Sequence, residues 1–140
     1  MTAPPPSRTA PGRRPPSAMS KSARTIYAFY LYMIVAGAGF VLVPNVFMGL
    51  IGFPETEGVW VRALGMMTMI MGYYYGVMAR NDVKEFFMAT VYGRTAVLFF
   101  FAGFVIAGLA PPALLLLAAV DVSGAIWTFT ALRSEQIQDG

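Results

Sequence analysis

Four apolar stretches are each long enough to cross a lipid bilayer as a helix, and they constrain the fold more than any other feature of the sequence. They cover about residues 25–43, 59–79, 86–109 and 112–132. The hydrocarbon core of a bilayer is about 30 Å thick, which takes about 20 apolar residues in an α-helix. Charged residues make up 12% of the 140 residues and hydrophobic residues 57%, whereas a soluble domain carries about 25% charged residues. The sequence therefore predicts an integral membrane protein.

The segments between the apolar stretches are short and contain residues that end helices. The first stretch ends at Pro44, a polar turn occupies residues 54–58, and Pro111-Pro112 separates the last two stretches. Proline lacks the backbone N–H and restricts the residue before it, so it interrupts a helix. Residues 46–53 are apolar but too short to cross, which predicts a helix extension or an interfacial segment. We expect an all-α, polytopic membrane protein whose four spans form an antiparallel four-transmembrane-helix bundle, with consecutive spans as neighbours.

The two ends of the chain differ in composition from its apolar middle. Residues 1–22 are rich in proline and arginine and lack repeated apolar positions, which predicts a disordered tail. We place the transmembrane domain at residues 23–133 and a short polar C-terminal tail at residues 134–140. Lys and Arg gather in the N-terminal tail, in the 80–85 turn and at Arg133, and such residues mark cytoplasmic flanks. We expect a multi-pass protein of the inner (plasma) membrane with both termini in the cytoplasm.

The sequence contains no histidine and no cysteine. Ser-His-Asp catalysis, thiolate nucleophiles, iron–sulfur clusters and His-ligated zinc or haem are therefore excluded for these residues. Seven carboxylates, ten Lys and Arg residues and seven tyrosines remain as candidate polar groups. We expect no cofactor, no metal and no catalytic residues, and a role in binding rather than in catalysis.

Two charged residues lie deep within the predicted spans. Asp121 is near the middle of the fourth span, and Arg94 is about eight residues, or roughly 12 Å, into the third. A charged side chain at the centre of the bilayer costs about 2.5–3.5 kcal/mol even on insertion scales, so it needs a partner or a role. The two spans are antiparallel and joined by a short turn, which brings both charges to similar depths. We predict an intramembrane Arg94–Asp121 ion pair.

Three roles remain open for this pair. It fixes the register of two helices, it forms part of a ligand or ion site, or it relays protons. The relay has the least support, because a carboxylate beside an arginine stays ionised, whereas a proton carrier has to change its charge.

Three consecutive tyrosines, Tyr73, Tyr74 and Tyr75, lie in the second span. Side chains of consecutive helical residues point about 100° apart, so the three cannot all face one site. Tyr73 or Tyr74 could share a polar site with Arg94. The alternative is that the tyrosines pack within the bundle or lie in the aromatic belt at the membrane interface.

Small residues indicate where helices approach one another closely. Gly65, Gly72 and Gly76 lie on one side of the second span, and Gly72 and Gly76 form a small-xxx-small pair. Gly124 provides a similar position in the fourth span. These glycines predict helix packing within the bundle, and the same motif also permits a homo-oligomer.

One set of residues carries a resemblance to a known group of proteins: Val61-Arg62-Ala63-Leu64-Gly65, Gly72-Tyr73-Tyr74-Tyr75, Ala79-Arg80, Gly93-Arg94, and Asp121 with Gly124, Ala125 and Trp127. This pattern, over about residues 60–133, resembles small uncharacterised four-span bacterial membrane proteins, of which the DoxX-like proteins are the nearest named group. The resemblance implies a four-helix membrane bundle. It supplies no mechanism and no catalytic residues.

Three functions are compatible with these features. The leading hypothesis is a small binding or accessory protein that scaffolds a larger membrane assembly or holds a lipophilic ligand. The alternative is a homo-oligomeric transporter or channel element that uses the Arg94 and Asp121 charges. An enzyme acting on lipids ranks third, because only this pair could serve as acid and base. As partners we expect the lipid bilayer, other membrane subunits or further copies of the chain, and no nucleic acid.

Overall fold

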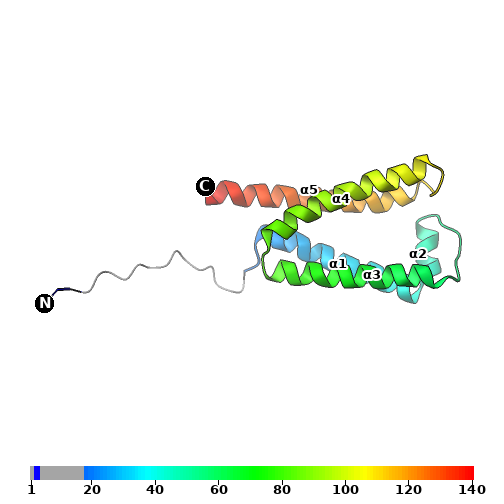
Figure 1. Ribbon diagram of the computed structural model, residues 1–140, viewed down its shortest axis with the longest axis horizontal. Helices are drawn as coiled ribbons and strands as arrows, with labels where there is room; N and C mark the ends of the chain where they lie inside the picture. Colours follow the sequence, from blue (N-terminus) through cyan, green and yellow to red (C-terminus); the bar gives the residue numbers. More distant parts are fainter. Residues whose placement is uncertain (1, 4–17) are drawn as a thin grey trace.

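A computed structural model describes residues 2–3 and 18–140 of the chain (Figure 1). All regular structure in this part is helical, which confirms the predicted all-α class for the described residues. Residues 1 and 4–17, most of the predicted disordered tail, lie outside the described residues. The helices are α1 (Lys21–Leu42), α2 (Pro44–Leu50), α3 (Val59–Arg80), α4 (Lys84–Ile106) and α5 (Leu114–Asp139).

Three helices in the described part of the chain, α1, α4 and α5, are long and apolar enough to cross a membrane. They correspond to the first, third and fourth predicted spans and are compatible with a multi-pass membrane protein. Helix α3 covers the second predicted span and has 22 residues, but it is not among the three. Its charged Arg62 and its three adjacent tyrosines make it less apolar than the other long helices.

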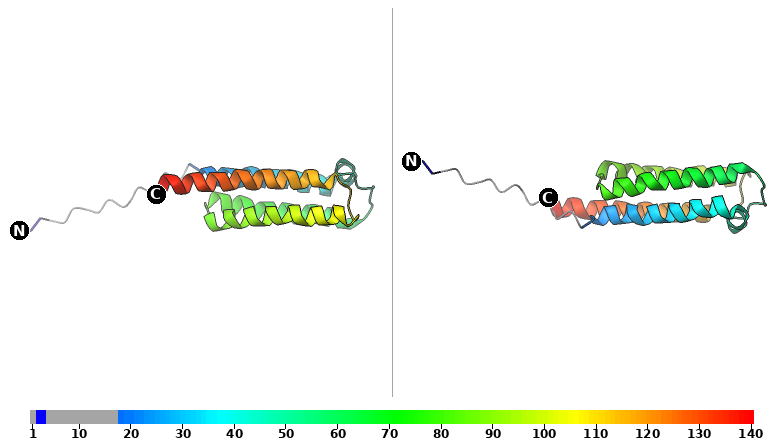
Figure 2. Two further views of the ribbon diagram at one scale, coloured as in Figure 1. Left: turned by 90° about the horizontal axis from the view of Figure 1, so that it is seen from above. Right: turned by 90° about the horizontal axis from the view of Figure 1, so that it is seen from below.

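The four long helices run alternately in opposite directions, and α1 begins at the same end of the molecule at which α5 finishes (Figures 1 and 2). We call the end of the molecule where α1 begins and α5 finishes the tail end; the α3–α4 turn lies there too. We call the opposite end, where α2 lies, the loop end. Helix α1 packs along α3, α4 packs along α5, and α1 also contacts α5. The α1–α3 pair and the α4–α5 pair thus form two layers (Figure 1).

Helices α3 and α4 are consecutive in sequence but do not pack along their whole lengths; their side chains meet toward the tail end, where the rings of Tyr75 and Phe86 are 5.1 Å apart. They meet at the short turn between Arg80 and Lys84 and diverge toward the loop end (Figure 1). The expectation that all consecutive spans pack together is therefore wrong for this pair, because α4 packs on α5 and α3 packs on α1.

The helix boundaries extend beyond the predicted spans at the tail end. Helix α1 begins at Lys21, where the Ser20 side chain accepts a hydrogen bond from the backbone N–H of Ala23 at 3.1 Å and caps the helix. Helix α5 continues to Asp139, so the segment predicted as a polar C-terminal tail is mostly helical. At the loop end, Pro44 starts a separate short helix, α2, which is turned across the axis of α1 (Figure 1) and does not extend it.

The predicted packing glycines of α3 face α1. Gly65, Gly72 and Gly76 are all buried. A Cβ atom added at Gly65 would lie 2.6 Å from the carbonyl oxygen of Gly37, and one added at Gly37 would lie 2.7 Å from the carbonyl oxygen of Gly65. The backbones of α1 and α3 therefore touch. This glycine face is occupied within the chain, so it is not available for the homo-oligomer that the sequence permitted.

The interior is best closed at the tail end, where Phe87 of α4 and Ile26 of α1 are fully buried with Ala79 and Leu132. Toward the loop end, large apolar residues such as Leu50, Trp60 and Ile106 are exposed. Exposed apolar side chains also cover the outer faces of the long helices. This surface suits a hydrocarbon environment, where the helix backbone satisfies its own hydrogen bonds.

Candidate functional site

Arg94 lies in the interior of the bundle and is surrounded by all four long helices. It projects from α4, and its neighbours are Phe29 of α1, Tyr75 of α3 and Gly124 of α5. The side chain is 3% exposed. A charged group in an apolar helix is costly on the lipid side, so it turns toward other protein groups. The depth of Arg94 in the sequence predicted this interior position correctly.

The guanidinium of Arg94 stacks on aromatic rings. Its Cζ atom lies 3.5 Å from the ring centroid of Phe29 and 5.5 Å from that of Tyr75, and the centroids of these two rings are 5.6 Å apart. A desolvated cation over an aromatic face gains about 2 kcal/mol. The rings therefore stabilise the flat faces of the guanidinium. The hydroxyl of Tyr75 also interacts electrostatically with the guanidinium, but it does not reach hydrogen-bond geometry with any of the N–H groups.

The N–H groups of Arg94 are unpartnered within the described residues. Nε, Nη1 and Nη2 are all buried, and none has a hydrogen-bond partner there. Arginine carries five N–H donors in a fixed fork, and a buried donor left unpaired costs about 1–3 kcal/mol, or more when it is charged. The site thus presents a preformed set of donors to any group that brings an acceptor.

The predicted Arg94–Asp121 ion pair is not formed as a direct contact. Asp121 lies on α5 near enough for the two charges to attract, but its carboxylate accepts no hydrogen bond from the guanidinium. The prediction placed both residues in one region correctly and was wrong about their contact.

Gly124 makes room for the guanidinium. A Cβ atom added there would lie 2.9 Å from Nη1 of Arg94 and 3.6 Å from the ring of Phe29. Gly124 and Phe29 also line a cavity of about 310 Å³ between α1 and α5, together with Thr25, Ala28, Tyr32, Val120, Ser123 and Trp127. Gly124 and Phe29 therefore separate the buried cation from a cavity that lies along the outer side of the α1–α5 pair.

Tyr75, rather than Tyr73 or Tyr74, is the tyrosine next to Arg94. Tyr73 and Tyr74 are 62% and 50% exposed, and their ring centroids are 6.0 Å apart on the outside of α3. The predicted site that joins one of them to Arg94 is therefore wrong. Helical spacing does not select Tyr75, because Tyr73 lies three residues before Gly76 just as Tyr75 lies three residues after Gly72.

A second polar group of residues joins three segments at the tail end. The Nζ atom of Lys84 donates hydrogen bonds to the Oγ atoms of Ser20 and Ser22, both at 2.7 Å, and to Oε2 of Glu135 at 2.6 Å. It also lies 3.0 Å from Oδ1 of Asp82. Glu135 in turn accepts from the backbone N–H and the hydroxyl of Ser22. We call these five residues the tail-end clamp.

The tail-end clamp predicts how stability depends on pH. Glu135 lies beyond the apolar part of α5. Burial alone would raise the pKa of Glu135, but hydrogen bonds from Lys84 and Ser22 and the charge of Lys84 outweigh it and hold the pKa below its ordinary value. Such a carboxylate stabilises the fold above its unfolded pKa and stops doing so as the pH falls through the folded pKa.

We therefore expect the melting temperature in detergent to fall as the pH drops below about 4.3, the ordinary pKa of glutamate. Glu135→Gln should lower the melting temperature at neutral pH. It should also make the melting temperature depend less on pH in the acid range. Glu55→Gln, at an exposed position in the loop-end connection, is the control and should follow the wild type. An acid profile of Glu135→Gln identical to that of the wild type would contradict the role of Glu135.

Comparisons with models of protein families, with characterised proteins and with solved structures give no match to the chain. The described residues also contain no group of three or more Asp and Glu side chains placed to hold a metal ion. The candidate site is therefore defined by its own geometry: a buried, unpartnered guanidinium, two aromatic rings and a glycine that separates it from a cavity.

Proposed function

We propose that the chain is a four-span inner-membrane protein that holds a lipophilic ligand, and that Arg94 donates hydrogen bonds to an acceptor oxygen of that ligand. One observation carries the proposal: Arg94 is buried with all three side-chain nitrogens unpartnered among the described residues. Hydrogen bonds from a charged group are about twice as strong as neutral ones, and a low dielectric strengthens them further. An acceptor delivered there would be bound tightly.

Helix α3 is the fourth span in this proposal. It packs antiparallel along α1, and the backbone contact between Gly37 and Gly65 holds the two helices at the same depth. If α1 crosses the bilayer, α3 crosses with it, although its tyrosines make it less apolar. The resemblance to DoxX-like proteins implies the same four-helix arrangement. The excess of Lys and Arg at the tail end supports a cytoplasmic location for that end in this proposal.

The cavity between α1 and α5 offers a route for a ligand from the bilayer. It is lined mainly by apolar and aromatic residues, and it borders Gly124, the residue that separates it from Arg94. Because Gly124 has no side chain, the barrier between the cavity and Nη1 is thinnest there. A lipophile lying in the cavity would have its acceptor group close to the guanidinium.

The transport alternative has less support. A pathway needs polar groups from several helices facing one channel, whereas Arg94 and Asp121 are the acidic and basic residues near the middle of the long helices in the described part of the chain. Aromatic rings also cover Arg94 rather than leaving it in an open space. The accessory role remains compatible with ligand binding, and the copurification experiment described in the Discussion addresses it.

Replacing Arg94 by methionine tests the proposed function. In delipidated protein, Arg94→Met should leave the melting temperature unchanged or raise it, because an apolar residue of similar length often replaces a buried charge without loss. Adding a total lipid extract of the host membrane should raise the melting temperature of the wild type by roughly 5 °C and that of the variant by little.

Arg133→Met is the matched control, since Arg133 is exposed near the end of α5. This variant should keep the full response to the lipid extract. If Arg94→Met lowers the melting temperature of delipidated protein strongly, and lipids stabilise wild type and variant equally, then Arg94 has a structural role and the proposal is wrong.

A further inference from the structure

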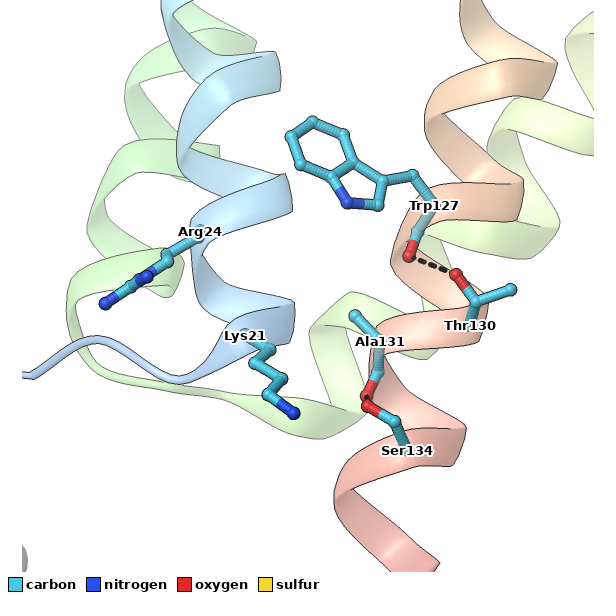
Figure 3. Close-up of a pocket in the computed structure, with 6 residues that line it drawn as sticks. All are labelled: Lys21, Arg24, Trp127, Thr130, Ala131 and Ser134. Carbon is cyan, nitrogen blue, oxygen red and sulfur yellow. Dashed lines mark hydrogen bonds between the residues drawn. The ribbon is translucent and has the colours of Figure 1, made fainter.

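A second cavity lies between α1 and α5 at the tail end (Figure 3). Its volume is about 340 Å³, and its lining residues are Lys21, Arg24, Trp127, Thr130, Ala131 and Ser134. The ring of Trp127 projects from α5 into the space between the two helices, and Lys21 extends from the first turn of α1 toward the same space (Figure 3). Arg24 lies one turn further along α1, and its side chain is directed away from α5 in this view.

The positive charges at this cavity are not neutralised by the protein. Neither Lys21 nor Arg24 forms an ion pair within the described part of the chain, and both are exposed. The acidic residue nearest in sequence to the lining of the cavity, Glu135, is bound to Lys84 at 2.6 Å. The tail-end clamp thus uses its carboxylates internally. Lys21 extends toward the cavity without an ion pair in the described residues, and Arg24 adds a second unpaired charge beside it.

The other lining groups leave these cations as the main donors to a ligand. The Thr130 hydroxyl donates to the carbonyl oxygen of Trp127 at 2.9 Å, and the Ser134 hydroxyl donates to that of Ala131 at 2.8 Å. The indole of Trp127 turns its nitrogen-bearing edge toward Lys21 (Figure 3). Tryptophan at this level of a membrane has one apolar side and one donor to the headgroup region.

Trp127 also connects this cavity to the deeper one. It lines both, and beyond it the groove is bordered by Phe29, Tyr32 and Val120. The lining of the groove is therefore cationic at the tail end and becomes apolar toward the middle of the helices. An amphiphile with an anionic head and a hydrocarbon chain has the same order.

We propose that this groove binds an anionic phospholipid, with the phosphate at Lys21, an acyl chain alongside Trp127, and Arg24 adding positive charge at the same end of α1. The inference rests on the placement of α1 and α5 across the bilayer in the proposed function, but not on the ligand at Arg94. Each basic residue near an anionic membrane surface contributes about 1 kcal/mol. Charge therefore favours an anionic headgroup over a zwitterionic one.

Quenching of Trp127 by brominated lipids tests this inference. The sequence contains two tryptophans, so Trp60→Phe leaves Trp127 as the single reporter. The full chain is placed in phosphatidylcholine vesicles that contain a minor fraction of brominated phosphatidylglycerol or the same fraction of brominated phosphatidylcholine. We expect phosphatidylglycerol to quench at least about twice as strongly, and Lys21→Gln/Arg24→Gln to make the two equal, since both positive charges near the headgroup are lost.

The matched control removes two exposed charges elsewhere at the tail end, with Arg80→Gln/Arg133→Gln. This variant should keep the preference for phosphatidylglycerol, and so should Arg94→Met, which separates failure of this inference from failure of the proposed function. If the wild type shows no stronger preference for phosphatidylglycerol than Lys21→Gln/Arg24→Gln does, the inference is wrong. If both double variants lose the preference to the same extent, general surface charge explains it, and the inference is also wrong. Absence of quenching by either lipid would overturn the membrane placement itself.

Two further measurements complete the test. Sodium phosphate and sodium chloride are compared at equal ionic strength, and they should affect the preference equally. Loss of the preference in phosphate alone would show a site for free phosphate and overturn the lipid as occupant. Should Trp60→Phe fail to fold, native mass spectrometry of the otherwise unchanged protein replaces fluorescence, with more phosphatidylglycerol than phosphatidylcholine retained by the wild type and equal amounts by Lys21→Gln/Arg24→Gln.

Discussion

Gly65→Ala is expected to lower the melting temperature of the protein in detergent by roughly 4–12 °C, because overpacking costs about 1–3 kcal/mol. The added methyl group would lie 2.6 Å from the carbonyl oxygen of Gly37 and 2.8 Å from Cβ of Phe40. The first of these atoms belongs to the backbone of α1, so the side chains cannot adjust to relieve the contact. The two helices would have to move apart along the whole α1–α3 interface.

Gly103→Ala is the control for this prediction. Nothing lies within 4 Å of a Cβ atom added at Gly103, and alanine is more favourable than glycine in a helix by about 0.5–1 kcal/mol. Its melting temperature, followed by circular dichroism in the same detergent, should equal or exceed that of the wild type. Equal effects of Gly65→Ala and Gly103→Ala would contradict the close backbone contact between α1 and α3.

Lys84→Met is the second change with a large expected effect. Lys84 donates to Ser20, Ser22 and Glu135, and the side chain of Glu135 is 11% exposed. Without the ammonium group, this carboxylate would remain largely buried with only Ser22 as donor. Hydrogen bonds to charged groups contribute about 1.5–3 kcal/mol each, so we expect a decrease of several degrees in melting temperature and faster proteolysis at the tail end.

A double-variant cycle shows whether the loss comes from the clamp. Lys84→Met and Glu135→Gln should together destabilise the protein by less than the sum of the two single changes, because they remove the same interaction. Lys21→Met, at an exposed lysine of the same end, should change the free energy of unfolding by within about 0.5 kcal/mol. Strict additivity of the first two changes would contradict a shared interaction.

Much of the fold follows from the lengths and breaks of the apolar stretches. They predict the all-α class and locate α1, α4 and α5, because hydrocarbon thickness and proline chemistry act locally along the chain. The glycine pattern of α3 predicts a packed face correctly. The partner of that face, and the divergence of α3 from α4, depend on contacts between distant helices that no local pattern specifies.

The helix ends show a similar limit. The number of consecutive apolar residues predicts the part of a helix that lies in the hydrocarbon core of a bilayer, and it does not predict where the whole helix ends. Helix α5 therefore continues through Glu135 to Asp139, beyond the last apolar residues of the predicted span. At the start of α1, Ser20 caps the helix before the apolar stretch begins.

The candidate site is partly predictable. The depth of Arg94 in its span predicts an interior position, whereas the spacing from Gly72 and Gly76 does not distinguish Tyr75 from Tyr73. Phe29 carries no signal in the sequence, since it is one aromatic residue among many in an apolar helix. Its contact with Arg94 is therefore found only in the structure, as is the lack of a hydrogen bond between the guanidinium and Asp121.

The most direct test of the central claim, that the chain holds a lipophile at Arg94, is native mass spectrometry of the protein released from its own membrane in mild detergent. We predict a discrete added mass on the wild type and on Arg133→Met, and its loss from Arg94→Met. The same added mass on Arg94→Met, or a wild type that carries only foreign subunits or further copies of the chain, would contradict the claim.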